Sequence, residues 1–284
     1  MDPNLLNDVT ESYARLTETE LTNIGIVLGA YRSFRGNRRD HIGYISMPIT
    51  TGRRYFEVLT AHGVRTSQEL EIKCGPTALF EEVIKPNIQE GIEFADQFGQ
   101  RENLLYIAPS VFEAKRWRWS QDAYMSLWYR VLGEMAGKHV LMDDWEYSVG
   151  GLKEYMFSMF MQWRCIRPFT EQMAVQEFGL KNLLPDMSPM RRMEEYQAMW
   201  SIRTFDASGN EIRIDQGLTR IVAAIQDLTA RGFDSKEMIN IAWKIMLTPM
   251  LSPYVGKGPY DAITETYSKA SDTLKTLVPP AQES

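Results

Sequence analysis

The sequence predicts an α/β fold, in which a parallel sheet is flanked by helices and followed by a mainly helical C-terminal addition. Three short apolar segments, each long enough for a buried strand, alternate with helical segments up to residue 163. Such alternation favours parallel strands joined by crossover helices. Beyond residue 165 the pattern is mainly helical. We therefore divide the chain into an N-terminal helical segment (1–40), an α/β core (41–165) and a C-terminal extension (166–284).

Composition narrows the classes of function. Of the 284 residues, 44% are hydrophobic and 24% are charged, as in ordinary globular proteins. The formal net charge of −6 argues against binding to bulk nucleic acid. The sequence shows neither a membrane span nor a secretory signal. Cys74 and Cys165 lie far apart and the histidines are scattered, so we expect a cytoplasmic protein with no metal and no cofactor.

The predicted elements of the first half follow from apolar spacing and from turn residues. Apolar residues at three-to-four spacing predict a helix over residues 4–34. The segments His41–Pro48 and Leu104–Pro109 read as strands, each ending in a proline. The next predicted helices are Thr77–Phe98, interrupted near Pro86, and the amphipathic segment Gln121–Met135.

The third predicted strand, His139–Met142, leads into the stretch around which we place the candidate site. Two acids and a tryptophan follow the strand, and the Gly-rich turn Ser148–Gly151 then opens a helix with Glu154 in its first turn. Ligands of parallel sheets bind outside the carboxyl ends of the strands, near helix N-termini. This order of residues therefore indicates one edge of a ligand site. Alternatively, Ser148 or Gly150 is a simple helix cap and Glu154 an ordinary acid favoured by the helix dipole.

A second candidate edge follows the first predicted strand. The loop Ile49–Arg54 is small, polar and flexible, and it precedes the helical segment Tyr55–Leu59. Backbone N–H groups and an arginine in such a loop can face a phosphate. The loop lacks the Gly-Lys-Ser/Thr ending of a P-loop, and a plain connection between two elements is the alternative.

Aromatic residues near these loops could stack a nucleobase. Lys115–Trp119 interleaves cations with tryptophans, a pattern that suits bases and phosphates, although the tryptophans could equally pack on the core. Trp117, Trp119 and Trp145 are all candidates, and stacking alone does not select a base.

The C-terminal extension shows a different character. Residues 173–203 are rich in methionine and charge and are broken between Pro185 and Pro189. The remaining features are a turn at Asp206–Asn210, which could form a small hairpin with Glu211–Ile214, two helices at Gly217–Arg231 and Ser235–Leu247, and a fraying end at 278–284.

Two separated segments resemble the nucleoside 2′-deoxyribosyltransferase superfamily, which includes the nucleoside 5′-monophosphate N-glycosidases. Tyr44–Arg53 (YISMPITTGR) resembles the first strand and loop of that superfamily. Ser148–Glu154 (SVGGLKE) is similar to its nucleophile motif Ser-x-Gly-x-x-x-Glu, and the lead-in Asp144–Ser148 also resembles some branches. The resemblance covers roughly residues 41–163. It implies a flavodoxin- or Rossmann-like fold and a homo-oligomer in which neighbouring subunits complete the pocket.

The resemblance also implies roles for catalytic residues. Glu154 would be the nucleophile, and Tyr44 would orient its carboxylate, unless Tyr44 is only a core residue. An acid on the preceding helix would serve the leaving base, and Asp122 is the best match. Asp143 and Asp144 are rivals for that role, with capping of the strand end as their alternative.

The same resemblance implies a set of substrate contacts. In the monophosphate hydrolases the Gly-Arg of the loop and the Ser of the motif bind the 5′-phosphate, which points to Gly52, Arg53 and Ser148. Thr50 and Thr51 stand where those hydrolases commonly have Arg and Gly. The full expected set of substrate-binding residues is Pro48, Ile49, Thr50, Gly52, Arg53, Asp144, Trp145, Ser148 and Gly150.

From the resemblance we expect hydrolysis of the N-glycosidic bond of a (deoxy)nucleoside 5′-monophosphate, giving free base and sugar phosphate. The expected partner is thus a small nucleotide or nucleoside, not bulk nucleic acid or a membrane. Three alternatives stay open: a base-exchanging deoxyribosyltransferase, an NAD glycohydrolase-like enzyme, and a nucleotide-binding protein without catalysis.

Overall fold

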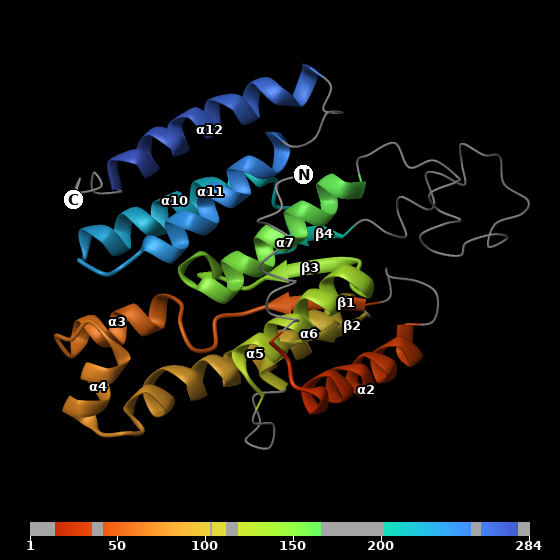
Figure 1. Ribbon diagram of the computed structural model, residues 1–284, viewed down its shortest axis with the longest axis horizontal. Coiled ribbons are helices and arrows are strands. Elements are labelled where there is room, and N and C mark those ends of the chain that lie inside the picture. Colours follow the sequence, from red (N-terminus) through yellow and green to blue (C-terminus); the bar gives the residue numbers. More distant parts are fainter. Residues whose placement is uncertain are drawn as a thin grey trace, which may run out of the picture.

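A computed structural model of the protein describes residues 15–35, 42–102, 104–111, 119–165, 202–250 and 257–277. Four parallel strands form one sheet in the order β2-β1-β3-β4 (Figure 1). They are β1 (Ile42–Ser46), β2 (Leu105–Ile107), β3 (Lys138–Leu141) and β4 (Arg203–Phe205). The sheet confirms the predicted α/β class, and its strand order is that of flavodoxin-like folds.

Strand β1 is buried along its whole length, as expected for a parallel strand covered on both faces. Gly43 is required here because the ring of Tyr106 on the neighbouring strand passes directly over it. A Cβ atom at position 43 would lie only 2.0 Å from a carbon of that ring. The pairing of β1 with β2 therefore depends on a residue without a side chain.

The predicted helices are present, with shifted ends. The described helices are α2 (Glu18–Arg35), α3 (Arg53–Ala61), α4 (Ser67–Cys74), α5 (Lys85–Glu102), α6 (Gln121–Glu134), α7 (Val149–Cys165), α10 (Ile214–Ala230), α11 (Lys236–Met250) and α12 (Lys257–Leu277). A π-helical segment at Phe80–Ile84 precedes α5. It lies just before Pro86, which has no N–H to donate, so the predicted interruption is confirmed.

Helices cover both faces of the sheet. The face of β1 that carries Tyr44 packs against α2 and α6, through residues such as Leu28 and Leu127. The opposite face, with Ile45, packs against α5 around Phe98. The molecule therefore has a helix, sheet, helix arrangement with apolar cores on both sides of β1.

The C-terminal helices α10, α11 and α12 lie together on the side of α7 (Figure 1). One apolar core joins residues of α3, α4 and α7 with residues of α10, α11 and α12. Strand β4 also comes from beyond residue 165 and pairs with β3. The position that the sequence suggests for a domain boundary is therefore crossed by both the sheet and this core.

The turn predicted at Asp206–Asn210 is confirmed. The amide of Asp206 donates to the carbonyl of Asn210 at 2.8 Å, and Phe205 forms an antiparallel bridge with Glu211. Several predicted features lie wholly or partly outside the described residues. They are residues 173–201 of the Met-rich segment 173–203, residues 115–118 of the basic and aromatic segment 115–119, residues 4–14 of the first helix, and the end at 278–284.

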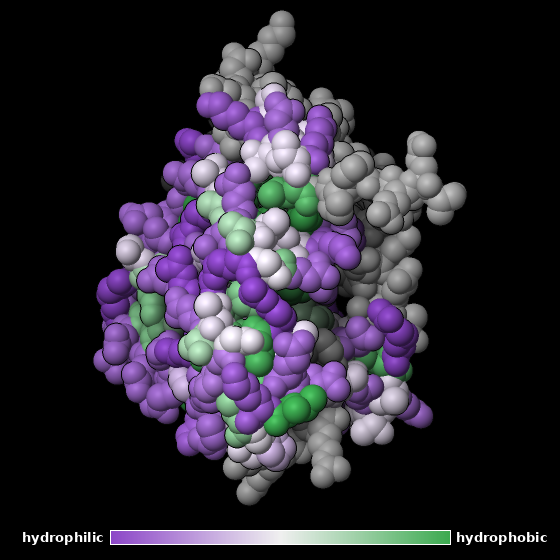
Figure 2. Space-filling view, turned by 90° about the vertical axis from the view of Figure 1, so that its left-hand side faces the viewer, coloured by the Kyte–Doolittle hydropathy of each residue, from purple (hydrophilic) through white to green (hydrophobic). Residues whose placement is uncertain are grey.

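The surface beside α3 and α4 is mainly hydrophilic, and its hydrophobic residues form separate spots (Figure 2). Among the helices that the structure describes, none combines the length and the apolar character needed to cross a membrane.

Candidate active site

A cavity of about 570 Å³ opens at the carboxyl ends of β1 and β3. These neighbouring strands connect to opposite sides of the sheet, since β1 leads to β2 and β3 leads to β4. Such a switch in direction is where open α/β sheets bind their ligands. The cavity walls come from the loop after β1 and from α6, α7 and α11.

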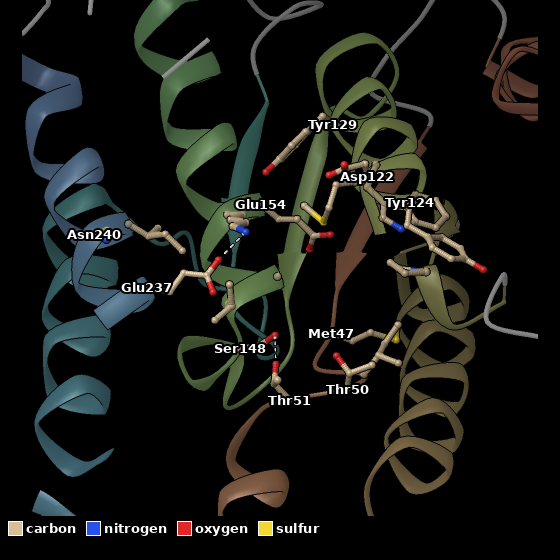
Figure 3. Close-up of a pocket in the computed structure, with 18 of the residues that line it drawn as sticks. Met47, Thr50, Thr51, Asp122, Tyr124, Tyr129, Ser148, Glu154, Glu237 and Asn240 are labelled. Atoms are coloured by element: carbon tan, nitrogen blue, oxygen red, sulfur yellow. Dashed lines mark hydrogen bonds and ion pairs between the residues drawn. The ribbon is translucent and has the colours of Figure 1, made fainter. Parts of the chain in front are cut away.

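Glu154 forms part of the cavity wall and is held by two hydroxyl groups from β1. The phenol of Tyr44 donates to Oε1 at 2.5 Å, and the hydroxyl of Ser46 donates to Oε2. Residues two apart on a strand point to the same face, so β1 presents both donors to one carboxylate. Glu154 is 5% exposed, and its carboxyl group faces the cavity (Figure 3).

The position of Glu154 on its helix differs from the sequence expectation. Helix α7 begins at Val149, so Glu154 lies in the second turn and not in the first. The helix dipole acts mainly within the first turn, and an ordinary dipole-stabilised surface acid would be exposed. Glu154 is instead a buried acid with its own donors, which removes the interpretation of this residue as an ordinary acid favoured by the helix dipole.

Burial shifts the pKa values of both Glu154 and Tyr44. Burial raises the pKa of Glu154 to about 7, while the hydrogen bonds from Ser46 and Tyr44 act in the lowering direction. The pKa of Tyr44 is raised well above its usual value by burial and then by the negative charge of Glu154. Tyr44 therefore keeps its proton at neutral pH and donates a hydrogen bond to the carboxylate.

His139 lies behind Tyr44 in the core. It is fully buried on β3 opposite Tyr44, and the two ring centroids are 5.7 Å apart. Its Nδ1 is 2.7 Å from the hydroxyl of Ser158, and burial lowers its pKa to about 3. The imidazole is therefore neutral and supports the Tyr44 ring as an uncharged neighbour.

The N-terminus of α7 forms a polar end of the cavity. The Ser148 hydroxyl accepts from the amide of Gly151 at 3.3 Å, so it does cap the helix, and it also accepts from Thr51 at 3.2 Å. Thr50 and Gly150 line the same cavity, where the first turn of a helix leaves N–H groups without intrahelical acceptors. This end of the cavity suits an anion.

Asn87 fixes the loop after β1, a role that sequence reasoning missed. Its side-chain amide donates to the carbonyl of Ile49 at 3.0 Å, and its own carbonyl accepts from Arg54 at 2.9 Å. Gly52 has a φ of 103°, and a Cβ there would lie 2.5 Å from Cβ of Pro48. Glycine is therefore needed for the close turn that sets Thr51 opposite Ser148.

The wall formed by α6 is mainly aromatic. It includes Tyr124, Met125, Trp128 and Tyr129, and it also carries Asp122. Asp122 forms an ion pair with Arg15 at 3.1 Å. Its two rivals, Asp143 and Asp144, line a separate smaller cavity, so the structure brings only Asp122 of these three acids to the cavity of Glu154.

Helix α11 forms the wall opposite α6, and sequence reasoning did not include it in the site. The lining residues are Glu237, Asn240, Ile241 and Lys244. Their spacing of three, four and seven residues places them on one face of a helix. Glu237 forms an ion pair at 2.8 Å with Lys153, the residue before Glu154 (Figure 3).

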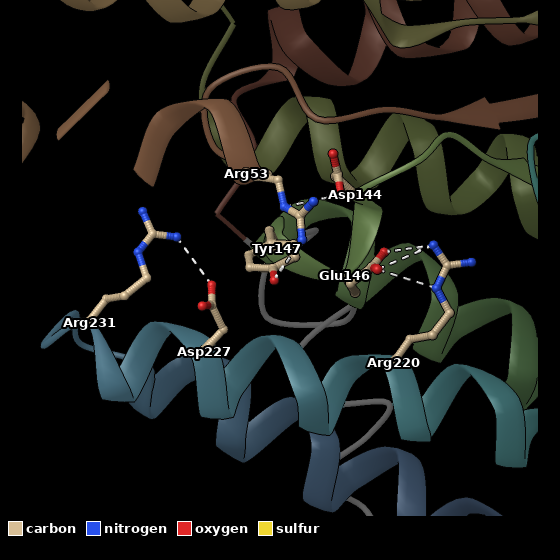
Figure 4. Close-up of polar contacts among 7 residues, drawn as sticks. All are labelled: Arg53, Asp144, Glu146, Tyr147, Arg220, Asp227 and Arg231. Carbon is tan, nitrogen blue, oxygen red and sulfur yellow. Dashed lines mark hydrogen bonds and ion pairs between the residues drawn. The ribbon is translucent and has the colours of Figure 1, made fainter. Parts of the chain in front are cut away.

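Arg53 is not placed with the residues around Glu154. Its guanidinium donates to the Tyr147 hydroxyl at 3.2 Å and pairs with Asp144 at 3.4 Å (Figure 4). It lines a smaller cavity of about 150 Å³, where Arg53 and Arg54 meet four acids: Glu57, Glu90, Asp143 and Asp144. The excess of negative charge there disfavours a phosphate, so the expected Arg53 phosphate contact is not present.

The predicted stacking role of Trp145 is wrong. The residue is fully buried in a 3₁₀ turn (Trp145–Tyr147), with its ring centroid 4.7 Å from that of Tyr155. Apolar packing against α7 turns the ring into the core and away from any ligand. Trp119 is half-buried against Tyr124 and does not line the cavity, and Trp117 lies outside the described residues.

Of the expected substrate-binding residues, Ile49, Thr50, Ser148 and Gly150 line the cavity of Glu154. Pro48, Arg53 and Asp144 line the smaller cavity instead, and Gly52 acts through the turn it allows. Thr51 lines both cavities. Within the described ranges, His, Cys, Asp and Glu side chains form no group of three or more that could hold a metal ion.

Comparison of the chain with protein-family models, with curated proteins and with solved structures finds no match.

Proposed function

We propose that the protein cleaves the N-glycosidic bond of a (deoxy)nucleoside 5′-monophosphate through Glu154, giving free base and sugar phosphate. The observation that supports this most strongly is the geometry of Glu154. A buried carboxylate with a hydroxyl donor on each oxygen lies in the wall of a cavity of about 570 Å³. That volume is within the range of small-molecule sites.

The reaction needs a carboxylate beside the sugar carbon C1′. As the C1′–N bond breaks, its electron pair goes to the base and positive charge develops on the sugar. An oxygen of Glu154 bonds to C1′, and the base nitrogen takes a proton from a water molecule that the Asp122 carboxylate, paired with Arg15, holds beside the base. The hydroxide that remains then attacks C1′ and frees Glu154.

The two ends of the cavity suggest an orientation for the substrate. The aromatic wall of α6 suits the flat face of a base, because ring stacking is tolerant of base type. The polar end at Thr51, Ser148 and the start of α7 suits the phosphate. In this orientation C1′ lies between them, on the side of Glu154.

A base-exchanging deoxyribosyltransferase is the second candidate, and the position of Arg53 favours it. Free nucleosides need no phosphate site, and Arg53, the residue expected to bind the phosphate, instead contacts Tyr147 and Asp144. A transferase would use the same covalent intermediate and let a second base, in place of water, attack C1′.

The test is release of free base from nucleosides, nucleoside 5′-monophosphates and NAD, each with and without an acceptor base. Wild type is compared with Glu154→Gln, and Glu93→Gln on the exposed side of α5 is the matched control. We expect release from monophosphates by wild type and by the control, and at least a thousandfold loss in Glu154→Gln.

The other outcomes separate the alternatives. Exchange with the acceptor base identifies a transferase, and release of nicotinamide alone identifies an NAD glycohydrolase. Equal residual release by wild type and Glu154→Gln contradicts catalysis by this carboxylate. Binding of nucleotides without any turnover would support a binding protein. We further propose a cytoplasmic location. We also propose a homo-oligomer, whose mass sedimentation of the purified protein would measure.

A further inference from the structure

Lys153 and Glu237 form an ion pair across the mouth of the cavity, between α7 and α11. Nζ of Lys153 lies 2.8 Å from Oε1 of Glu237, and both residues line the cavity. Their side chains are 34% and 59% exposed, so water reaches both groups. Figure 3 shows Glu237 directed from α11 toward the space beside Glu154 and Ser148.

The position of Lys153 on α7 directs its charge toward the polar end of the cavity. Val149, Gly150, Lys153 and Glu154 are the α7 residues that line the cavity, and their spacing places them on one helix face. Side chains of a helix lean toward its N-terminus, which favours rotamers of Lys153 that reach the first turn, on the side of Ser148. That is the end of the cavity that suits the phosphate.

The ion pair can exchange partners when an anion enters. Exposed ion pairs of lysine with glutamate are weak because water screens both charges. A phosphate dianion beside the α7 N-terminus offers Lys153 a more highly charged partner. Glu237 has the opposite effect, since its carboxylate repels a phosphate and competes for the same ammonium group.

We propose that Lys153 and Glu237 set the preference of the cavity for phosphorylated over unphosphorylated nucleosides, with Lys153 binding the 5′-phosphate and Glu237 opposing it. This inference rests on the proposed function. Lys153 of α7 takes the role that was expected of Arg53, which lines the smaller cavity. The inference also gives helix α11 a role in substrate selection.

The experiment measures kcat/KM for a nucleoside 5′-monophosphate and for the matching nucleoside, and the readout is their ratio. We expect Lys153→Met to lower this ratio about tenfold, and Glu237→Gln to raise it about threefold. Lys236→Met is the matched control. Lys236 is exposed on α11, the helix of Glu237, and its Nζ lies 3.9 Å from Oδ2 of Asp234. It does not line the cavity. The control leaves the ratio unchanged.

Calorimetric binding of the same two ligands is measured alongside turnover, with Lys153→Gln as a second variant in case Lys153→Met does not fold. Ratios that stay equal to wild type in the Lys153 and Glu237 variants overturn the inference and leave the proposed function intact. If no variant or wild type releases base, the proposed function fails. The binding ratios then still decide whether this pair selects for phosphate.

Discussion

Tyr44 on β1 donates a hydrogen bond to Oε1 of Glu154 on α7 over a distance of 2.5 Å, although the two residues are 110 positions apart in the sequence. Ser46 holds the other carboxylate oxygen from the same strand. The two donors fix the plane of the carboxylate, because a group held at both oxygens cannot rotate freely. A carboxylate that is fixed in advance is ready to meet a reacting carbon.

We expect Tyr44→Phe to lower kcat by about tenfold to a hundredfold. The substitution leaves one oxygen of a buried carboxylate without its donor, which costs on the order of 1–3 kcal/mol. Base release measures the effect. Tyr106→Phe is the control, because the Tyr106 hydroxyl is buried and has no hydrogen-bond partner among the described residues, so its removal should be neutral. Equal losses in both variants would show that the hydrogen bond to Glu154 is not the cause.

The rate of base release should rise with pH through a midpoint of about 7. Glu154 must be ionised to attack C1′, and burial raises its pKa to about 7. In Tyr44→Phe the midpoint should move to higher pH. In the wild type the Tyr44 hydrogen bond stabilises the ionised form of Glu154, and the variant lacks that bond. A pH profile of kcat/KM checks both statements, and a rate that falls between pH 6 and pH 8 would contradict a carboxylate nucleophile.

Glu154→Gln should stabilise the protein more at pH 8 than at pH 5. The pKa of Glu154 is about 7 in the folded protein and 4.5 for a glutamate in water, so ionisation opposes folding as the pH rises between these two values. The full difference is roughly 3 kcal/mol. Urea unfolding at both pH values measures it. A gain that is independent of pH would show that the carboxyl group does not titrate in this window.

His139 should make the protein sensitive to acid. Its pKa is lowered from 6.5 to about 3 by burial, so the unfolded chain takes up a proton below pH 6.5 that the folded protein refuses. Stability from this residue is present above pH 6.5 and falls by about 1.4 kcal/mol per pH unit below it. In His139→Gln the unfolding free energy should change less steeply with pH between pH 4 and pH 6. The slope should fall by about 1.4 kcal/mol per pH unit, the contribution of one proton. An unchanged slope would mean that His139 protonates equally in both states.

The sequence contained the local signals for the core of the site. The motif around Glu154 and the position of Tyr44 led to residues that the structure brings into contact. Ser46 was missed, although it lies two residues after Tyr44 and strand alternation places both on one face. The face of α11 was also readable, since Glu237, Asn240 and Lys244 recur at helical spacing in an otherwise apolar segment.

The sequence predictions that differ from the structure concern residues whose positions depend on partners far away in the sequence. Arg53 turns away from Glu154 because Tyr147 and Asp144 offer it acceptors, and a loop sequence does not report where such acceptors lie. Trp145 is buried through packing on Tyr155, which no local pattern shows. Strand β4 has three residues and is defined by its pairing with β3, so its own sequence carries little signal.

Helix α7 has two working faces, and this limits how the protein can change over evolution. One face presents Glu154 to the cavity, and the other places Tyr155 against α10, where a Cβ on Gly217 would come within 2.1 Å of the tyrosine oxygen. The helix that carries Glu154 is therefore aligned by Gly217, which lies more than sixty positions later in the chain. Recombination at residue 165 would not transfer the complete site, because the N-terminal half alone would lack the α10 surface on which α7 packs. Substitutions in α10 that move α7 would also move Glu154, so substitutions in α10 and in the cavity must be compatible with each other.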